Sequence, residues 1–358
     1  MNLYSCLSLG VQVRKFRLKT RKPQVETEEG RRDRAVELIY QHNIGKGINI
    51  LEGFGRADPD DPDIKKQMKE KHPVAVGVHA EDWPEIPEDW YSIARDSVES
   101  DEMLKRIAKV IRETDPTTSV GPRGLHYNYL SVLFTGHMST PESKAATDRL
   151  GDLAARYLSC GLPAWARRLL GGGLLTPLVK KAPAVGCTPD ARPVKAEDAD
   201  TSTFCKALNK QVTPAAKRQL IPQQLGIGVS GGIQITTIGL TMKYEEARER
   251  RDDVFGAIDI SNAHNAFPQR DAFVALIDMA REDEALIPLV VGMRATLWAQ
   301  NDIYMRSRVE KSGFSHLCRV ESGGGQGNGL TAVIFASHIK KLAKDIARKY
   351  DRSEEAHV

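Results

Sequence analysis

Long apolar runs and paired cysteines are both missing from this sequence. No apolar run reaches the roughly 20 residues of a membrane-spanning helix, and the mean hydropathy is −0.38, so we expect no integral membrane function. The five cysteines are odd in number and form no C-x-x-C pair. This argues against a disulfide framework or a structural zinc site and favours a reducing compartment. Residues 1–13 lack a positively charged segment, so secretion is not expected.

The composition also gives no sign of a disordered chain or of a repeat protein. Hydrophobic residues make up 41% and charged residues 27% of the 358 positions. That balance can bury the core of one large domain or of two to three smaller ones. Basic residues exceed acidic ones by 51 − 47 = 4, so a polyanionic partner is permitted but not required.

The spacing of apolar residues predicts a mostly helical chain with a few short strands. A helix is expected from about Ser100 to the residues before Pro116. A hairpin that carries Lys180, Lys181, Arg192 and Lys195 is expected within residues 174–198. A strand is expected at Val254–Ile260, followed by a turn, and a second hairpin at residues 302–320. Further helices are expected at residues 143–171, 204–218, 233–250, 270–281, 287–299 and 330–350.

The N-terminal region is rich in charge and proline. Six of the nine residues at positions 14–22 are basic: Arg14, Lys15, Arg17, Lys19, Arg21 and Lys22. This segment is typical of a nuclear-import or nucleic-acid-binding patch, or equally of a solvated arm. Residues 56–73 are expected to form a linker, because three prolines interrupt a strongly charged stretch. Residues 81–90 are similar, but Trp83 and Trp90 are expected to anchor them to a core.

Two short enzyme patterns overlap at Gly226–Gly232. The glycines match the G-x-G-x-x-G fingerprint of dinucleotide sites, and Ser230 lies in a G-x-S-x-G nucleophile pattern. Both patterns require a preceding apolar strand, and Ile221-Pro222-Gln223-Gln224 is a poor strand. We therefore interpret this segment as a glycine loop that opens the next helix.

Asp259 and Gly323–Gly329 are the remaining candidates for chemistry. Asp259 ends the expected strand, where a carboxylate could bind Mg²⁺ together with substrate phosphates. Alternatively, it caps the turn at Asn262. The glycine-rich loop could let the backbone approach a ligand, with Gln326 reading a base or sugar edge and the following helix favouring phosphate. Alternatively, it is a connector that needs positive φ angles.

Between about Thr114 and Tyr350 the sequence contains, in order, SVGPRGL, PLVKK with ARPV, LNKQV with PQQLGIGVSGGIQ, AIDISNAHNAF and GGGQGNGLTAVIF. Together these five segments resemble the reverse transcriptase domain of non-LTR retrotransposons. SVGPRGL is similar to the segment that opens the fingers, and PLVKK with ARPV to the fingers hairpin. LNKQV with PQQLGIGVSGGIQ resembles the segment before the palm. AIDISNAHNAF and GGGQGNGLTAVIF resemble the first and second palm motifs. The five segments are Ser119–Leu125, Pro177–Lys181 with Ala191–Val194, Leu208–Val212 with Pro222–Gln234, Ala257–Phe267, and Gly323–Phe335.

The resemblance implies an α+β right-hand polymerase with fingers and a partial palm, an antiparallel sheet with packed helices, preceded by a helical N-terminal region. It divides the chain into a basic arm and linker-rich region (1–99), a helical region with the fingers (100–252) and a partial palm (253–358). It implies a primer–template of RNA or DNA and deoxynucleoside triphosphates as partners, and a nuclear location, with the cytoplasm as the alternative.

The resemblance also implies a role for individual residues in two-metal nucleotidyl transfer. Asp259, with the carbonyl of Ile260, would hold Mg²⁺. The nucleotide would contact the residues matched to the family's nucleotide site: Lys180, Lys181, Arg192, His264, Gln326 and Gly327. His264 would lie under the sugar, where the family has Phe or Tyr.

The sequence departs from the family pattern in ways that bear on activity. A tyrosine followed by two adjacent aspartates, the third palm motif, has no match in these 358 residues. Asn328 and Gly329 replace the Asp and Pro of the second motif. One carboxylate cannot hold two divalent ions, because Mg²⁺ gives up water reluctantly, so we expect no polymerase activity from this chain alone. The alternative is a non-catalytic nucleic-acid-binding remnant of a retroelement; a metabolic enzyme of Rossmann or hydrolase type is not expected.

Overall fold

A computed structural model describes residues 28–40, 50, 55–74, 83–116, 118–135, 141–180, 184, 186–249, 260–298 and 300–350. The chain divides into two compact units, residues 1–52 and residues 53–358. In the first unit, helix α1 (Glu28–Tyr40) is described. Several expected features lie outside the described residues: Arg14, Lys15, Arg17, Lys19, Arg21, Lys22, Lys181, and Asp259 with the other residues 254–259 of the strand expected at Val254–Ile260.

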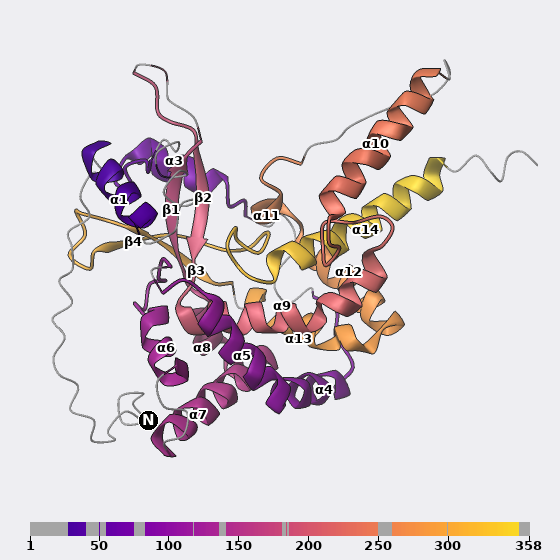
Figure 1. The fold of residues 1–358 in the computed structure, drawn as a ribbon, viewed down its shortest axis with the longest axis horizontal. Helices are drawn as coiled ribbons and strands as arrows, with labels where there is room; N and C mark the ends of the chain where they lie inside the picture. Colours follow the sequence, from indigo (N-terminus) through magenta and orange to yellow (C-terminus); the bar gives the residue numbers. More distant parts are fainter. Residues whose placement is uncertain are drawn as a thin grey trace, which may run out of the picture. The chain divides into compact units, whose positions relative to one another are not determined.

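The second unit is an α+β fold, as expected, and most of its described residues are helical (Figure 1). Its α-helices are α3 (Pro62–Glu70), α4 (Asp89–Val98), α5 (Asp101–Glu113), α6 (Tyr127–Thr135), α7 (Pro141–Leu158), α8 (Ala164–Gly171), α9 (Ala199–Leu220), α10 (Gly232–Glu249), α11 (Ala263–Ala266), α12 (Gln269–Glu282), α13 (Ile287–Leu297) and α14 (Thr331–Tyr350); η3 (Glu284–Leu286) is a short 3₁₀ helix.

The described residues of this unit form a four-stranded sheet with strand order β2-β1-β3-β4. The strands are β1 (Gly173–Val179), β2 (Ala191–Ala196), β3 (Asp302–Arg306) and β4 (Phe314–Arg319). Both expected hairpins are confirmed, because β1 with β2 and β3 with β4 pair antiparallel. The expectation of an antiparallel sheet is wrong at its centre, where β1 and β3 run parallel. Each of these strands follows a helix and opens a hairpin, so pairing the two opening strands makes the sheet mixed.

Residues 56–73 pack against this sheet, so the expectation of a linker is wrong. Helix α3 begins after Asp61, whose carboxylate accepts hydrogen bonds from the backbone N–H groups of Asp63 (2.8 Å) and Ile64 (3.4 Å). Ile64 and Met68, four residues apart on one helix face, are buried in a cluster with apolar residues of the sheet. Two apolar side chains in a charged stretch are too sparse a pattern to predict a packed helix.

A larger core lies among the helices. Every residue of α13 is buried, because this helix is enclosed by its neighbours and has no solvent face. Helix α5 starts at the cap residue Ser100, whose hydroxyl accepts a hydrogen bond from Met103 N–H (3.2 Å), and its apolar face packs on α9. Trp83 and Trp90 are buried in the same core, and the Trp83 ring centroid lies 4.6 Å from that of Phe273. The expected anchoring by the two tryptophans is confirmed.

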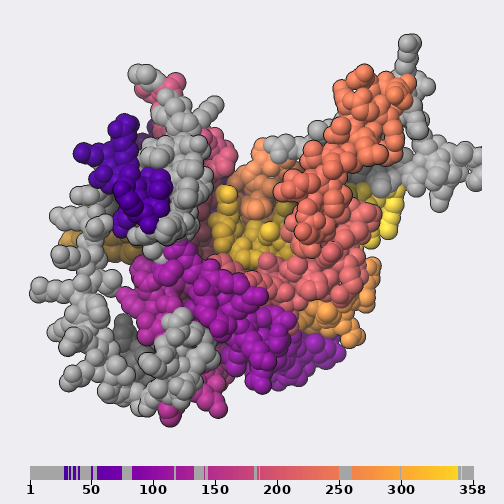
Figure 2. All heavy atoms as spheres, viewed as in Figure 1, coloured from indigo at the N-terminus to yellow at the C-terminus, as the bar shows by residue number. Residues whose placement is uncertain are grey.

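The glycine segment Gly226–Gly232 leads into α10, as expected. Helix α9 ends at Leu220 just before it, so the strand that a dinucleotide fingerprint or a nucleophile elbow requires is absent from this described segment. Figures 1 and 2 show α10 standing out from the second unit. Its large apolar side chains are exposed: Ile233, Ile235, Ile238, Leu240, Met242 and Tyr244.

Candidate functional site

The glycine-rich loop between β4 and α14 is fixed to α11 by backbone hydrogen bonds. Gly323 N–H donates to the Phe267 carbonyl (2.8 Å), and Gly324 N–H donates to the His264 carbonyl (2.9 Å). Gln326 N–H donates to the side-chain Oδ1 of Asn265 (2.9 Å). Two segments about 60 residues apart in sequence therefore form one structural element.

Glycine is required in this loop because the loop lies close to other parts of the chain. Gly323 has a φ angle of +63°, and a methyl group there would collide with the backbone of Asn265 and His264. Gly327 has a φ angle of +123°, and a methyl group there would collide with the Lys195 carbonyl oxygen. The alternative interpretation, a connector that needs positive φ angles, therefore explains one requirement for glycine. The close approach of other parts of the chain is a second requirement.

The end of β2 reaches the other side of the same loop. Lys195 N–H donates to the Gln326 carbonyl (2.9 Å). The Lys195 side chain is buried, and its ammonium group forms an ion pair with Glu197 (3.0 Å). Glu197 Oε1 also accepts a hydrogen bond from Asn328 Nδ2 (2.8 Å). Because both charges are out of water, this pair must stay matched, and it ties the first hairpin to the glycine loop.

The turn at Ser119–Leu125 is attached just after β2. Asp198 is fully buried and accepts hydrogen bonds from the backbone N–H groups of Arg123 (3.1 Å) and Leu125 (2.9 Å). Burial raises the pKa of Asp198, although the Arg123 charge and these two N–H groups oppose the rise. The Arg123 guanidinium pairs with Asp200 (2.6 Å). These carboxylates therefore hold the turn in place.

Three of the expected nucleotide-binding residues lie in this assembly. Gln326 is half-buried, and Gly327 is exposed. The His264 ring is half-buried and meets the Phe335 ring edge-on, with centroids 5.9 Å apart. The contact of these residues with nucleotide stays a prediction.

The other expected site residues lie elsewhere or are only partly tested. Lys180 follows β1 and forms an ion pair with Asp190 (3.0 Å) at the far end of the hairpin. Arg192 is exposed on β2, opposite Leu178. Ile260 is exposed, but its expected partner Asp259 is outside the described residues, as is Lys181. Among the described residues, no cluster of three or more His, Cys, Asp or Glu side chains could hold a metal ion, so Mg²⁺ stays an expectation.

The sequence placed Asn262 in a turn but did not predict that Asn262 and Asn265 organise this site. Asn262, with a φ angle of +55°, donates from Nδ2 to the Lys71 carbonyl (2.5 Å). Its Oδ1 accepts from Asn265 Nδ2 (2.9 Å), which orients Asn265 toward Gln326. The available signal was the spacing of two asparagines three residues apart, in a turn where Asn tolerates the left-handed conformation.

A groove of about 540 Å³ lies between α8 and strands β3 and β4. Trp165 and Leu169 of α8 line it and are 61% and 52% exposed. Tyr304 of β3 and Phe314 of β4 line the same groove, together with Arg123. Trp165 is exposed and Tyr304 and Phe314 are half-buried, and aromatic rings at a surface can stack on nucleic-acid bases.

No protein-family model matches the chain, and no curated protein matches it. In the part of the chain that the structure describes, no helix is long and apolar enough to cross a membrane.

Proposed function

We propose that residues 114–350 form a reverse-transcriptase-like domain, with fingers and a partial palm descended from an enzyme of template-directed nucleotidyl transfer. One observation carries the proposal. The Gln326 backbone bonds to Asn265 on one side and to Lys195 on the other. The two segments that resemble the palm motifs therefore meet at a single residue, which also bonds to β2 directly after the ARPV segment, and the resemblance alone does not require this.

The proposal gives each segment a role. The α11 turn and the glycine loop form the floor for the nucleotide, with Gln326 and Gly327 beside its base and His264 beneath its sugar. Asp259 precedes α11 by a few residues and supplies the carboxylate for Mg²⁺. Lys180 and Arg192 on the hairpin approach the triphosphate when it binds.

This chain alone binds the substrate but does not extend a primer. Two Mg²⁺ ions repel each other, and a single carboxylate leaves most of that repulsion and of the lost hydration uncompensated. Purified protein is assayed with primer–template, deoxynucleotides and either Mg²⁺ or Mn²⁺. No template-dependent product is expected, and synthesis would overturn this part of the proposal.

Nucleotide binding tests the site itself. Binding of a deoxynucleoside triphosphate, followed by calorimetry, is expected to require Mg²⁺ and to be lost in Asp259→Asn. Asp278→Asn is the matched control, since Asp278 is an exposed aspartate on α12 that pairs with Arg281 (3.5 Å). Binding that is independent of the metal, or equal in the two variants, would contradict the proposed nucleotide site.

The second candidate is nucleic-acid binding without chemistry, and the aromatic groove between α8 and strands β3 and β4 favours it. If this groove binds single-stranded nucleic acid by stacking, Trp165→Ala and Tyr304→Ala weaken binding by roughly 1–3 kcal/mol each. The triple variant of Lys180, Lys181 and Arg192 to Ala reduces the salt dependence instead, because phosphate contacts release counterions. Lys311→Ala, on the exposed turn between β3 and β4, is the control.

A further inference from the structure

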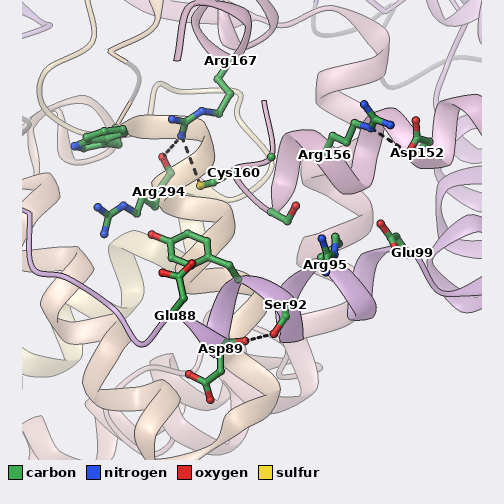
Figure 3. A pocket seen from close by; sticks show the side chains of 14 residues that line it. Glu88, Asp89, Ser92, Arg95, Glu99, Asp152, Arg156, Cys160, Arg167 and Arg294 are labelled. Carbon is green, nitrogen blue, oxygen red and sulfur yellow. Dashed lines mark hydrogen bonds and ion pairs between the residues drawn. The ribbon is translucent and has the colours of Figure 1, made fainter. Parts of the chain in front are cut away.

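A cavity of about 980 Å³ lies among α4, α7, α8 and α13, and none of its residues belongs to the glycine-loop site (Figure 3). Four arginines line it: Arg95, Arg156, Arg167 and Arg294. Arg95 and Arg156 are exposed, whereas Arg167 and Arg294 are only 5% and 9% exposed. The two buried guanidinium groups distinguish this cavity from an ordinary surface depression.

Arg167 is a buried cation without a counter-ion among the described residues. Its Nη1 donates to the Arg294 carbonyl (3.3 Å) and to Cys160 Sγ (3.5 Å), and its buried Nε has no hydrogen-bond partner. No carboxylate of the described residues forms an ion pair with it. A guanidinium stays charged at any ordinary pH, and an unpaired buried charge is strongly destabilising.

Cys160 does not supply the missing negative charge. Burial raises the pKa of its thiol to about 11, although Arg167 and Arg294 act in the opposite direction. The thiol is therefore neutral near pH 7, and its S–H faces the Val291 carbonyl (3.7 Å).

Arg294 adds a second, weakly compensated positive charge. Its guanidinium carbon lies 5.4 Å from the centre of the Trp298 ring, and that of Arg167 lies at the same distance from the same ring. Among the described residues the acidic partner of Arg294 is Glu85, at 3.5 Å, and the Glu85 side chain is 86% exposed. Two cations on one indole repel each other, and one exposed carboxylate offsets little of that repulsion.

We propose that this cavity binds a small phosphate monoester, with the phosphate held by Arg167 and Arg294. The two negative charges of a phosphate monoester match two guanidinium groups, whose planar donors bind phosphate oxygens in pairs. Exposed acids at the cavity, Glu88, Asp89 and Glu99, repel a long polyanion, so the ligand is a small molecule and not a nucleic-acid backbone.

The test measures thermal stability of the full chain in inorganic phosphate and in phenyl phosphate, against sodium chloride at equal ionic strength. Both phosphates are expected to raise the melting temperature of the wild type beyond the effect of chloride. A larger effect of phenyl phosphate indicates an organic monoester as the ligand, and an equal effect indicates free phosphate. No shift beyond chloride with either probe overturns the proposal.

Variants locate the effect. Arg167→Met and Arg294→Met are expected to weaken phosphate binding at least about tenfold, because each removes a charge-assisted pair of hydrogen bonds. Arg156→Met is the matched control: it removes an arginine from the same cavity, but one that already pairs with Asp152 (3.2 Å). If Arg167→Met does not fold, Arg294→Met decides. Equal binding in Arg294→Met and the wild type, or equal loss in Arg156→Met, overturns the assignment. Asp259→Asn keeps the phosphate effect, which separates this site from the nucleotide site.

Discussion

Replacing Gly323 with alanine tests whether contact with α11 is what requires glycine in the loop. The new Cβ would lie 2.5 Å from Asn265 Cα and from the His264 carbonyl oxygen, so the loop or α11 must move. Gly313, in the turn between β3 and β4, is the matched control. Its φ angle is +74° against +63° for Gly323, and a Cβ there meets no atom within 4 Å.

The two substitutions share one cost and differ in another. An alanine in the left-handed region costs about 1–2 kcal/mol at either position, and the effect on the unfolded chain cancels in the comparison. At Gly323, overpacking adds roughly 1–3 kcal/mol. Weakening of the hydrogen bonds from Gly323 and Gly324 N–H adds about 1 kcal/mol. Gly323→Ala is therefore expected to be less stable than Gly313→Ala by roughly 2–4 kcal/mol.

Urea unfolding measures this difference. With a slope of about 3 kcal/mol per molar urea, the midpoint of Gly323→Ala should lie roughly 1 M below that of Gly313→Ala. Equal midpoints for the two variants would refute the reasoning, because they would mean that α11 does not constrain the loop. A decrease confined to Gly313→Ala would refute it as well.

Two further perturbations probe the groups around the loop. Lys195→Met leaves Glu197 buried without its cation and is expected to lower the free energy of unfolding, measured in urea, by about 3–5 kcal/mol. The double variant Lys195→Met with Glu197→Gln should regain part of that stability. No recovery in the double variant would contradict the ion-pair argument. Burial, reinforced by the Lys195 charge, lowers the pKa of His72 below its ordinary value of 6.5. The neutral His72 side chain therefore stabilises the fold above pH 6.5, and this stabilisation is lost as the pH falls through the lowered pKa of the folded protein. The variant His72→Asn keeps a donor for the Met68 carbonyl. Its melting temperature should therefore fall less between pH 7.5 and pH 5 than that of the wild type. The remaining pH dependence is expected from His338, whose pKa is also lowered by burial. Equal slopes would contradict this assignment.

The elements with a regular apolar pattern could be predicted from the sequence. The face of α5 repeats every three to four residues, and the two hairpins have turns marked by glycine or proline, so local spacing was sufficient. Helix α3 could not be predicted, because its burial depends on the sheet above Ile64 and Met68 and not on its own periodicity. The parallel pairing of β1 and β3 could not be predicted either, since no local signal states which strands become neighbours across more than 100 residues.

The candidate site also contains parts that could be predicted from the sequence and parts that could not. Glycine enrichment marked the loop at Gly323–Gly329, because residues with positive φ angles leave a compositional signal. Lys195 and Glu197 leave no such signal in the sequence. They lie in a polar stretch where they resemble solvated charges, and only the fold shows that they are buried. The buried ion pair that links β2 to the glycine-rich loop was therefore harder to predict from the sequence than the loop itself.

The bonds between segments explain why five weak motifs can be more informative together than separately. The Glu197 side chain bonds to Asn328, the Lys195 backbone to the Gln326 backbone, and the Asp198 side chain to the turn at Arg123, so a change in any one segment disturbs a partner in another. Burial makes each of these bonds costly to break, which constrains the order and spacing of the segments more strongly than any single residue. A chain that kept this network after losing a catalytic carboxylate would still hold the loop and α11 together. Under the proposed function, nucleotide binding outlasts synthesis, so a binding assay on the purified chain is a more sensitive test of the proposal than a primer-extension assay.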